Sequence, residues 1–305
     1  MSPVEHCRIW KGSKCLAGAG RVLKGDLMSE SCEKSSCEGC SSAGNCSLQT
    51  QSLLEAPNPY SHIRTVIGVN SGKGGVGKSF VTASLASAMT AEGYRVGILD
   101  ADITGPSIPK MYGLHGPAVG DERGVLPIPA QDGTKIMSVN LLMQDEEAPV
   151  IWRGPILAGT VKQFWNEVCW GDLDYLFVDM PPGTGDVPLT IFQSLPVDGV
   201  VTVTSPQDLV TLIVKKAYHM MEQMDIPVIG VIENYSYMTC PCCGERISVF
   251  GESGIEQVTE ELGIDLLGKL PVDPEWAKAA DSGTFASLQV PGLQKAVEKI
   301  KALNR

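Results

Sequence analysis

The chain has 305 residues, of which 43% are hydrophobic and 19% are charged, so it can bury one large core and is not disordered throughout. Its formal net charge of −11 argues against a broad basic surface, and we do not expect nucleic acid as a partner. No stretch approaches about 18 consecutive apolar residues, and no apolar run follows the basic N-terminal residues, so we expect a cytoplasmic protein without a membrane partner.

The ten cysteines are gathered in groups rather than spread along the chain. Six precede residue 47, Cys169 stands alone, and three follow at 240, 242 and 243. In a reducing compartment thiols stay free, so tight groups of them favour metal or redox sites over disulfides.

Residues 1–60 lack sustained periodicity, are rich in Ser, Gly and Cys, and end in Pro-Asn-Pro, which predicts an arm and a linker. Over 61–305 short β-branched runs alternate with longer amphipathic stretches, as in a mostly parallel, doubly wound sheet of the α/β class. Strands are predicted at 65–70, 96–100, 135–139, 175–179, 200–204, 228–233 and 265–267. Helices are predicted at 79–92, 156–168, 209–224, 252–262 and 291–303.

A phosphate-loop motif, G-x-x-x-x-G-K-S, follows the first predicted strand and precedes the first predicted helix, as the motif requires. Glycines let successive N–H groups turn around phosphate oxygens, and the helix adds its positive end. Lys78 supplies charge to the β- and γ-phosphates of ATP, and the Ser79 hydroxyl can enter a Mg²⁺ shell. The predicted ATP-binding residues here are Gly72, Lys73, Gly74, Gly75, Val76, Gly77, Lys78 and Ser79. The alternative is a glycine turn that matches by chance.

Two aspartates follow predicted strands, where an ATP hydrolase needs carboxylates. Asp179 ends the strand at 175–179, and we expect it to hold Mg²⁺ through water. Asp102 lies just beyond the strand at 96–100 and is the candidate to orient the attacking water. The sequence P-P-G-T-G-D at 181–186 predicts a switch loop that senses the γ-phosphate. The alternative is that these residues cap strand ends or form ordinary turns.

Lys73 is a second lysine inside the loop, at a position where an ordinary phosphate loop needs no charge. The form K-G-G-V-G-K-S resembles the deviant Walker A motif of the septum-site, chromosome-partitioning, nitrogenase iron-protein and arsenite-pump ATPases. The resemblance implies a homodimer that sandwiches nucleotide, in which Lys73 reaches the partner's nucleotide and offsets charge during phosphoryl transfer. The predicted catalytic residues are therefore Lys73, Lys78, Asp102 and Asp179.

Cys240 and Cys243 form a C-x-x-C pair in a segment, 239–250, inserted in the predicted ATPase domain. Two thiolates cannot saturate a zinc ion or a cluster that needs four cysteines, so one chain carries half a site. If the nucleotide dimer is two-fold, the pair meets its own copy near the axis and four sulfurs surround one cluster. A structural zinc knuckle has the same local sequence, and thiolate softness does not separate zinc from iron.

Four motifs together resemble the Mrp/ApbC iron–sulfur carriers, over about residues 63–303. They are D-A-D-I-T-G-P-S-I-P at 100–109, P-P-G-T-G-D at 181–186, S-P-Q at 205–207 and C-P-C-C-G at 240–244. The resemblance implies that Asn234 recognises adenine and that Cys240 and Cys243 bridge a 4Fe-4S cluster between subunits, which passes to apo iron–sulfur proteins. The chain departs from the family with N-Y-S at 234–236, where many relatives have N-M-S, and with an added thiol at Cys242, whose role stays open.

The N-terminal arm places four thiols within fifteen residues, with ferredoxin-like spacing, which is enough to ligate a second cluster in one chain. They are Cys32, Cys37, Cys40 and Cys46. The last three resemble the arm of the eukaryotic cytosolic iron–sulfur assembly scaffold, whose leading cysteine falls where this chain has Leu23. A zinc site and a flexible thiol tail are the alternatives. Cys7 and Cys15 have no assigned role.

Three functions from different classes fit these observations. We expect an ATP-dependent cluster carrier. The second is a positioning or partitioning ATPase with a structural zinc site, which would bind membranes or DNA. Apolar and basic residues in the stretch Val290–Arg305 are its weak support. The third is a nucleotide-gated electron donor, although the cysteine ligands of the nitrogenase iron protein are widely separated in sequence.

Overall fold

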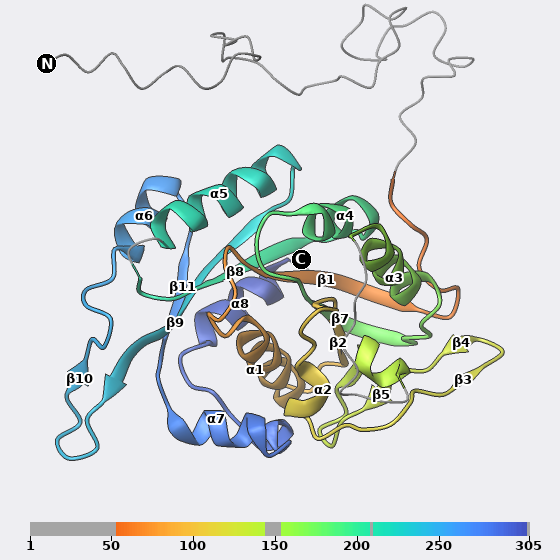
Figure 1. The fold of residues 1–305 in the computed structure, drawn as a ribbon, viewed down its shortest axis with the longest axis horizontal. Helices are drawn as coiled ribbons and strands as arrows, with labels where there is room; N and C mark the ends of the chain where they lie inside the picture. The colour runs from red at the N-terminus through yellow and green to blue at the C-terminus, as the bar shows by residue number, and fades with distance from the viewer. Residues whose placement is uncertain (1–52, 144–153, 208–209, 304–305) are drawn as a thin grey trace, which may run out of the picture. The chain divides into compact units, whose positions relative to one another are not determined.

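The computed structural model describes residues 53–143, 154–207 and 210–303 (Figure 1). The arm cysteines named above, including the four predicted ligands, lie outside the described residues. The chain divides into two units, Met1–Ser52 and Leu53–Arg305, and the fold described below is that of the second.

A nine-stranded sheet lies at the centre of this unit, in the order β10-β9-β8-β1-β7-β2-β6-β5, with β11 also paired to β9. Seven strands are mutually parallel: β1 (His62–Ser71), β2 (Val96–Asp100), β6 (Lys135–Ser138), β7 (Asp172–Asp179), β8 (Gly199–Thr204), β9 (Val228–Thr239) and β11 (Leu266–Pro271). Short antiparallel strands β5 (Ile128–Pro129) and β10 (Arg246–Ile247) end the order, and β3 (Gly120–Asp121) pairs with β4 (Gly124–Val125) separately. The predicted α/β class with a mostly parallel sheet is confirmed.

Helices cover both faces of the sheet (Figure 1). One face carries α1 (Lys78–Ala91), α2 (Ile108–Met111), α7 (Pro274–Asp281) and α8 (Gln294–Ala302), together with the 3₁₀ turn η2 (Phe285–Ser287). The other carries α3 (Gly154–Asn166), α4 (Asp186–Ser194) and α5 (Val210–Gln223), with α6 (Ile255–Leu262) against α5. The 3₁₀ turn η1 (Val139–Leu142) follows β6. Central strands are therefore buried on both sides, which explains their nearly continuous apolar sequences.

All five predicted helices are present, each with ends within three residues of the prediction. The short α2, α4 and α7 were not predicted. Helix α7 nevertheless carries local start signals, because Asp273 accepts a hydrogen bond from the Glu275 N–H at 2.9 Å and Pro274 is the first helical residue.

The strand predicted at 228–233 is six residues longer, since β9 continues to Thr239. Its second half is stabilised by pairing rather than by apolar sequence: Tyr237 pairs with Pro271 of β11, and Met238 and Thr239 pair with β10. The result is a β9–β10 hairpin that projects from the edge of the sheet (Figure 1).

Helix α8 packs into the core rather than presenting a free amphipathic face. Its apolar residues Ala296, Val297 and Ile300 are buried. Two of its lysines, Lys295 and Lys299, both pair with Asp265, at 2.9 and 2.6 Å, and Lys301 pairs with Glu92. Most of the features that supported a membrane-binding helix at 291–303 are thus used within the fold, and Leu303 is the exposed exception among its apolar residues. Within the described ranges, no helix is long and apolar enough to cross a membrane.

The residues just before β1 are tied to the helices of one face. The Glu55 N–H donates to the Ser194 carbonyl at 2.8 Å, and the Trp165 indole N–H donates to the Glu55 carbonyl at 2.9 Å. The Asn58 N–H donates to the Trp165 carbonyl at 3.2 Å. This part of the predicted linker therefore enters β1 along α3 and α4.

Candidate functional site

The predicted phosphate loop spans the gap between β1, which ends at Ser71, and α1, which begins at Lys78. Gly75 and Gly77 adopt φ values of 78° and 79°, a left-handed conformation that glycine reaches without steric cost. Gly77 caps α1 without a side-chain hydrogen bond, so the first N–H groups of the helix remain available to a ligand. The loop therefore offers an anion site at the carboxyl end of a central strand.

Lys78 is buried among carboxylates, with only 6% of its side chain exposed. Its ammonium nitrogen lies 2.8 Å from Oδ1 of the fully buried Asp179 and 3.7 Å from Oδ2 of Asp102. The Ser79 hydroxyl donates to Oδ2 of Asp179 at 2.5 Å, and the Thr82 hydroxyl donates to Oδ1 at 2.8 Å. Four predicted side chains thus converge, and oxygen groups of this kind suit Mg²⁺. Thr82 joins them without having been predicted.

A further carboxylate, Asp100 at the end of β2, was not predicted as a site residue. It is completely buried and accepts hydrogen bonds from the Ser138 hydroxyl and the Ile108 N–H, both at 3.3 Å. Burial raises the pKa of Asp100 to about 8, and the negative charge of Asp179 adds to the rise. Burial also raises the pKa of Asp102. Three carboxyl groups therefore crowd around the buried ammonium of Lys78, and the negative potential that raises these pKa values favours a cation at this position.

A cavity of about 440 Å³ opens at the loop. Predicted residues form part of its wall: Gly74, Gly75, Gly77, Lys78, Ser79 and Asp102. Pro182, from the predicted switch loop, also lines it. Sequence reasoning missed Lys110 of α2, Tyr235 of β9, and Ala280 and Asp281 of α7. Tertiary packing brings these residues to the loop, and only Tyr235 lies in a motif singled out above, N-Y-S at 234–236.

Lys73 and Asn234 make other contacts. The Lys73 ammonium donates to the side-chain oxygen of Gln207, in the loop after β8. The Asn234 amide donates to the Val76 carbonyl at 3.0 Å, and the residue is 1% exposed. Contact of Lys73 with a partner and of Asn234 with adenine stay predictions.

The C-x-x-C pair lies at the turn of the β9–β10 hairpin. The Cys240 N–H donates to the Glu245 carbonyl at 2.8 Å, and the Gly244 N–H donates to the Cys240 carbonyl at 2.9 Å. Backbone N–H groups of Cys242 and Cys243 donate to the Cys240 sulfur and lower the pKa of its thiol. Cys242 and Cys243 are exposed. The turn therefore stabilises a thiolate at the surface, the form that binds metal.

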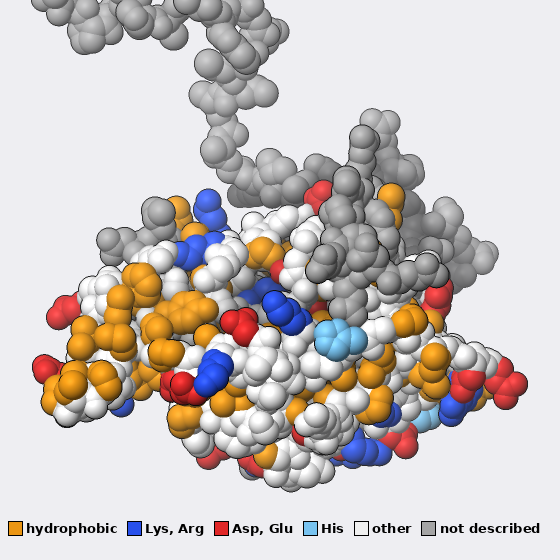
Figure 2. All heavy atoms as spheres, turned by 60° about the horizontal axis from the view of Figure 1, so that its bottom comes forward, with side chains coloured by type: hydrophobic (Ala, Val, Ile, Leu, Met, Phe, Trp, Pro, Cys, Tyr) orange, Lys and Arg blue, Asp and Glu red, His pale blue; other side chains and the backbone are white. Residues whose placement is uncertain are grey.

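Apolar side chains accompany the cysteines on the hairpin. Met238, Ile247, Val249 and Phe250 are exposed. Figure 2 shows hydrophobic side chains gathered on the left of the molecule, where the hairpin projects. No group of three or more Cys, His, Asp or Glu side chains that could hold a metal ion occurs among the residues of the described ranges.

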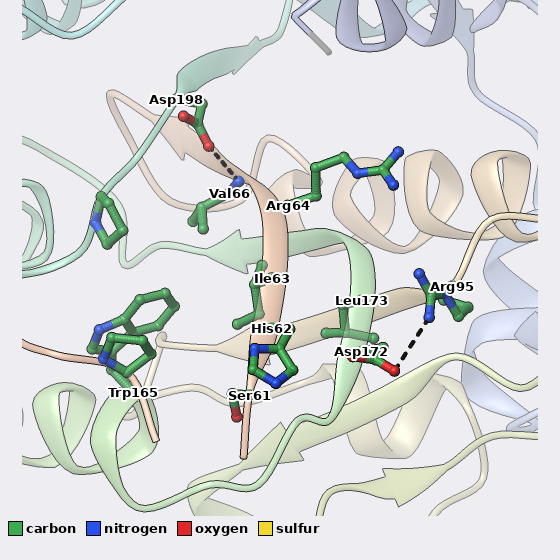
Figure 3. A pocket seen from close by; sticks show the side chains of 12 residues that line it. Ser61, His62, Ile63, Arg64, Val66, Arg95, Trp165, Asp172, Leu173 and Asp198 are labelled. Atoms are coloured by element: carbon green, nitrogen blue, oxygen red, sulfur yellow. Dashed lines mark hydrogen bonds and ion pairs between the residues drawn. The ribbon is translucent and has the colours of Figure 1, made fainter. Parts of the chain in front are cut away.

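A second cavity, of about 580 Å³, lies at the opposite edge of the sheet, where the parallel strands begin (Figure 3). Its charged groups already have partners. The Asp198 carboxylate accepts from the Val66 N–H at 2.8 Å, and Arg95 pairs with Asp172 at 3.6 Å and with Asp174 at 3.0 Å. This cavity is larger than the one at the phosphate loop but contains none of the predicted site residues.

Known proteins resemble the chain over most of its length. A family model described as the NUBPL iron-transfer P-loop NTPase, of ParA type, matches residues 62–304. An iron-sulfur cluster carrier protein from Methanocaldococcus jannaschii is 45% identical over 254 residues, which cover 81% of this chain and 87% of that protein.

Solved structures agree with the fold. A nucleotide-binding protein from Archaeoglobus fulgidus, in complex with ADP, is 41% identical with a TM-score of 0.67, over 74% of this chain and 88% of that one. The cell division protein MinD from Aquifex aeolicus shares the fold alone, at 22% identity and a TM-score of 0.53, over 78% of this chain and 96% of that one. With its phosphate loop, buried lysine and exposed cysteine turn, this chain belongs to the NUBPL iron-transfer P-loop NTPase family.

Proposed function

We propose that the chain is an ATP-dependent iron–sulfur cluster carrier that holds a 4Fe-4S cluster between two copies of itself and transfers it to apo-proteins. The observation that carries the proposal is the β9–β10 hairpin, which presents a surface thiolate turn on the same strand that contacts the phosphate loop through Asn234. The M. jannaschii relative, which is named as a cluster carrier, supports it.

Each copy contributes Cys240 and Cys243 to the cluster, so two copies together supply four thiolates. The exposure of Cys243 and the N–H groups aimed at the Cys240 sulfur favour a ligand that approaches from outside the chain. Cys32, Cys37, Cys40 and Cys46 would hold a second cluster within the arm.

ATP hydrolysis would use the groups around Lys78. Ser79 and, through water, Asp179 would hold Mg²⁺, which supplies charge to the phosphates. Lys78 would bind the β- and γ-phosphates, and Asp102 would orient the attacking water. Lys73 would reach the nucleotide of the partner subunit, which requires it to leave Gln207. Hydrolysis would be slow and coupled to cluster binding, with a coupling free energy of about 1–3 kcal/mol, which is the usual range between two sites.

Anaerobic reconstitution with iron and sulfide tests the cluster site. To silence the arm, the four predicted arm ligands are replaced by serine in the full-length chain. In this background Cys240→Ser and Cys243→Ser should each abolish the cluster absorbance and the cluster-dependent dimer. Cys169→Ser, at a buried cysteine of the core, is the matched control and should retain both. A bridging cluster that survives both hairpin substitutions would contradict the assignment.

Metal analysis of the same samples separates iron from zinc. One 4Fe-4S cluster per dimer corresponds to about two iron atoms per chain, whereas a structural zinc site gives zinc that reconstitution does not displace. The Cys242→Ser variant, measured in parallel, should keep its iron because the two-copy site already has four thiolates.

A further inference from the structure

Tyr235 has an unusual backbone conformation beside the phosphate loop. Its φ is 59°, in the left-handed region that bulky side chains rarely adopt. Its half-buried side chain lines the 440 Å³ cavity together with Gly77, Lys78 and Ser79. Residues held in such conformations concentrate at ligand sites and switches, because the surrounding structure must enforce them.

The phosphate loop packs tightly against this part of β9 at Gly77. A methyl group on Gly77 would lie 3.0 Å from the Tyr235 hydroxyl oxygen and 2.2 Å from the Asn234 amide nitrogen. That amide donates to the Val76 carbonyl in the same loop. A movement of Val76 or Gly77 when nucleotide binds would therefore act on Asn234 and Tyr235.

Beyond Tyr235 the strand is held along its length up to the cysteines. The Ser236 hydroxyl donates to the buried carboxylate of Glu233 at 2.6 Å, and the Val272 N–H donates to the Tyr237 carbonyl at 2.7 Å. Pairing with β10 then reaches Thr239, the residue before Cys240. Four residues of supported strand thus join Tyr235 to Cys240, and the five residue steps span roughly 17 Å at about 3.3 Å each.

We propose that Tyr235 contacts the bound nucleotide and positions the C-x-x-C hairpin according to whether the cavity is occupied. The role of this movement in a carrier rests on the proposed function, because a hairpin whose position depends on nucleotide would hold or release the cluster. The contact and the movement concern the chain alone and exist without a cluster.

The test measures nucleotide affinity and hairpin reactivity on reduced, metal-free, full-length protein. Alkylation rates of Cys240, Cys242 and Cys243 are followed by peptide mass spectrometry without nucleotide, with ADP, and with Mg²⁺ and a non-hydrolysable ATP analogue. In the wild type, saturating analogue should change the hairpin rates by about fivefold or more, the lower limit of ordinary coupling between sites.

Tyr235→Asn removes the ring while keeping a residue that tolerates a left-handed φ. We expect it to weaken analogue binding by about tenfold and, at saturation, to abolish the change in alkylation rates, since the loop no longer acts on the strand through the ring. Tyr235→Phe, which keeps the ring, should restore the change. If the asparagine variant fails to fold, Tyr235→Gly serves the same purpose, because glycine adopts φ near 59° without strain.

Tyr237→Asn is the matched control. It lies two residues further along β9, outside the lining of the cavity, with its ring beneath the Arg246 guanidinium at 4.4 Å. It should keep wild-type nucleotide affinity. The proposal would be overturned if the alkylation rates of the wild type did not change with nucleotide, or if those of Tyr235→Asn changed as in the wild type. Failure of the carrier function would appear only in cluster reconstitution, so the two failures are distinguishable.

Discussion

The ammonium group of Lys78 lies 2.8 Å from a carboxylate oxygen of Asp179 that has no exposed surface. Asp100 is buried nearby, and Asp102 approaches the same ammonium at 3.7 Å. One buried cation therefore lies among three carboxyl groups, of which Asp100 keeps its proton up to about pH 8. We expect stability and nucleotide binding both to depend on the pair of Lys78 with Asp179.

Lys78→Met should destabilise the protein strongly. The substitution keeps the length of the side chain but leaves the buried Asp179 without its cation, and breaking a buried ion pair in this way costs about 3–5 kcal/mol. Urea denaturation at pH 7 without nucleotide measures the change in the free energy of unfolding.

Arg95→Met is the matched control for this loss. Arg95 makes a two-point ion pair with Asp174, which lies on β7 as Asp179 does. The arginine, however, is 56% exposed. Its removal should cost clearly less free energy of unfolding than the removal of Lys78, because solvent screens the pair. If the two variants lost equal free energy of unfolding, the burial of Lys78 would not explain why its pair with Asp179 is important.

Asp100 should make stability fall as pH rises. Its pKa is about 8 in the folded protein and 3.8 in an unperturbed chain, so between pH 4 and pH 8 the folded state keeps a proton that the unfolded state releases. Stability is therefore greatest at the acid end of this window and decreases toward its alkaline end, by at most about 1.4 kcal/mol per pH unit.

The Asp100→Asn variant isolates this contribution. The asparagine oxygen can still accept from Ser138 and Ile108, but the side chain does not titrate. Urea denaturation at pH 5, 6.5 and 8, with EDTA and without nucleotide, should show the variant gaining on the wild type as pH increases. Parallel pH profiles would contradict the expectation.

The parts of the site that local sequence encodes were predictable. The phosphate loop is one contiguous motif between a strand and a helix, and Asp179 ends a continuous apolar strand. The loop and Asp179 lie where the motif requires them, since the Ser79 hydroxyl oxygen is 2.5 Å from Oδ2 of Asp179. Such features depend on neighbouring residues and on strand direction, which a single sequence reveals.

The missed parts depend on contacts between distant segments. Helix α7 brings Ala280 to the cavity because Trp276 stacks on Phe80, with ring centroids 5.6 Å apart. The later half of β9 is a strand because β10 and β11 pair with it. Polar side chains such as Tyr235 carry no periodic signal in that segment, so neither its strand nor its place in the cavity could be inferred from the sequence.

Gly77→Ala should destabilise the protein more than Gly75→Ala. The two glycines share a left-handed φ, 79° and 78°, so alanine costs about 1–2 kcal/mol at either position. A methyl group at Gly77 would in addition meet the Asn234 amide nitrogen at 2.2 Å, whereas Gly75 faces open space. Overpacking of this kind adds about 1–3 kcal/mol. The urea midpoint measured without nucleotide should be lower for Gly77→Ala than for Gly75→Ala. Identical midpoints would show that Asn234 and β9 move aside for the added methyl group at no cost in stability.

Mixing two inactive variants tests whether Lys73 acts on the partner's nucleotide. Lys73→Ala and Asp102→Ala should each lose ATP hydrolysis, since one lacks the lysine supplied to the partner and the other lacks its own water-orienting carboxylate. In a mixed dimer, the site on the Lys73→Ala chain keeps its Asp102 and receives Lys73 from the other chain. Half of the dimers in an equal mixture are mixed and each has one intact site, so turnover should recover to about a quarter of the wild-type value, as symmetric exchange requires.

Lys78→Met mixed with Asp102→Ala controls for this recovery. Lys78 pairs with Asp179 and approaches Asp102 of its own chain, so one site of the mixed dimer lacks Lys78 and the other lacks Asp102. No activity should return. Recovery in this control but not in the Lys73 mixture would place Lys73 in its own site and Lys78 in the partner's, the reverse of the assignment. Recovery confined to the Lys73 mixture instead requires that the contact of Lys73 with Gln207 be exchanged for one across the dimer.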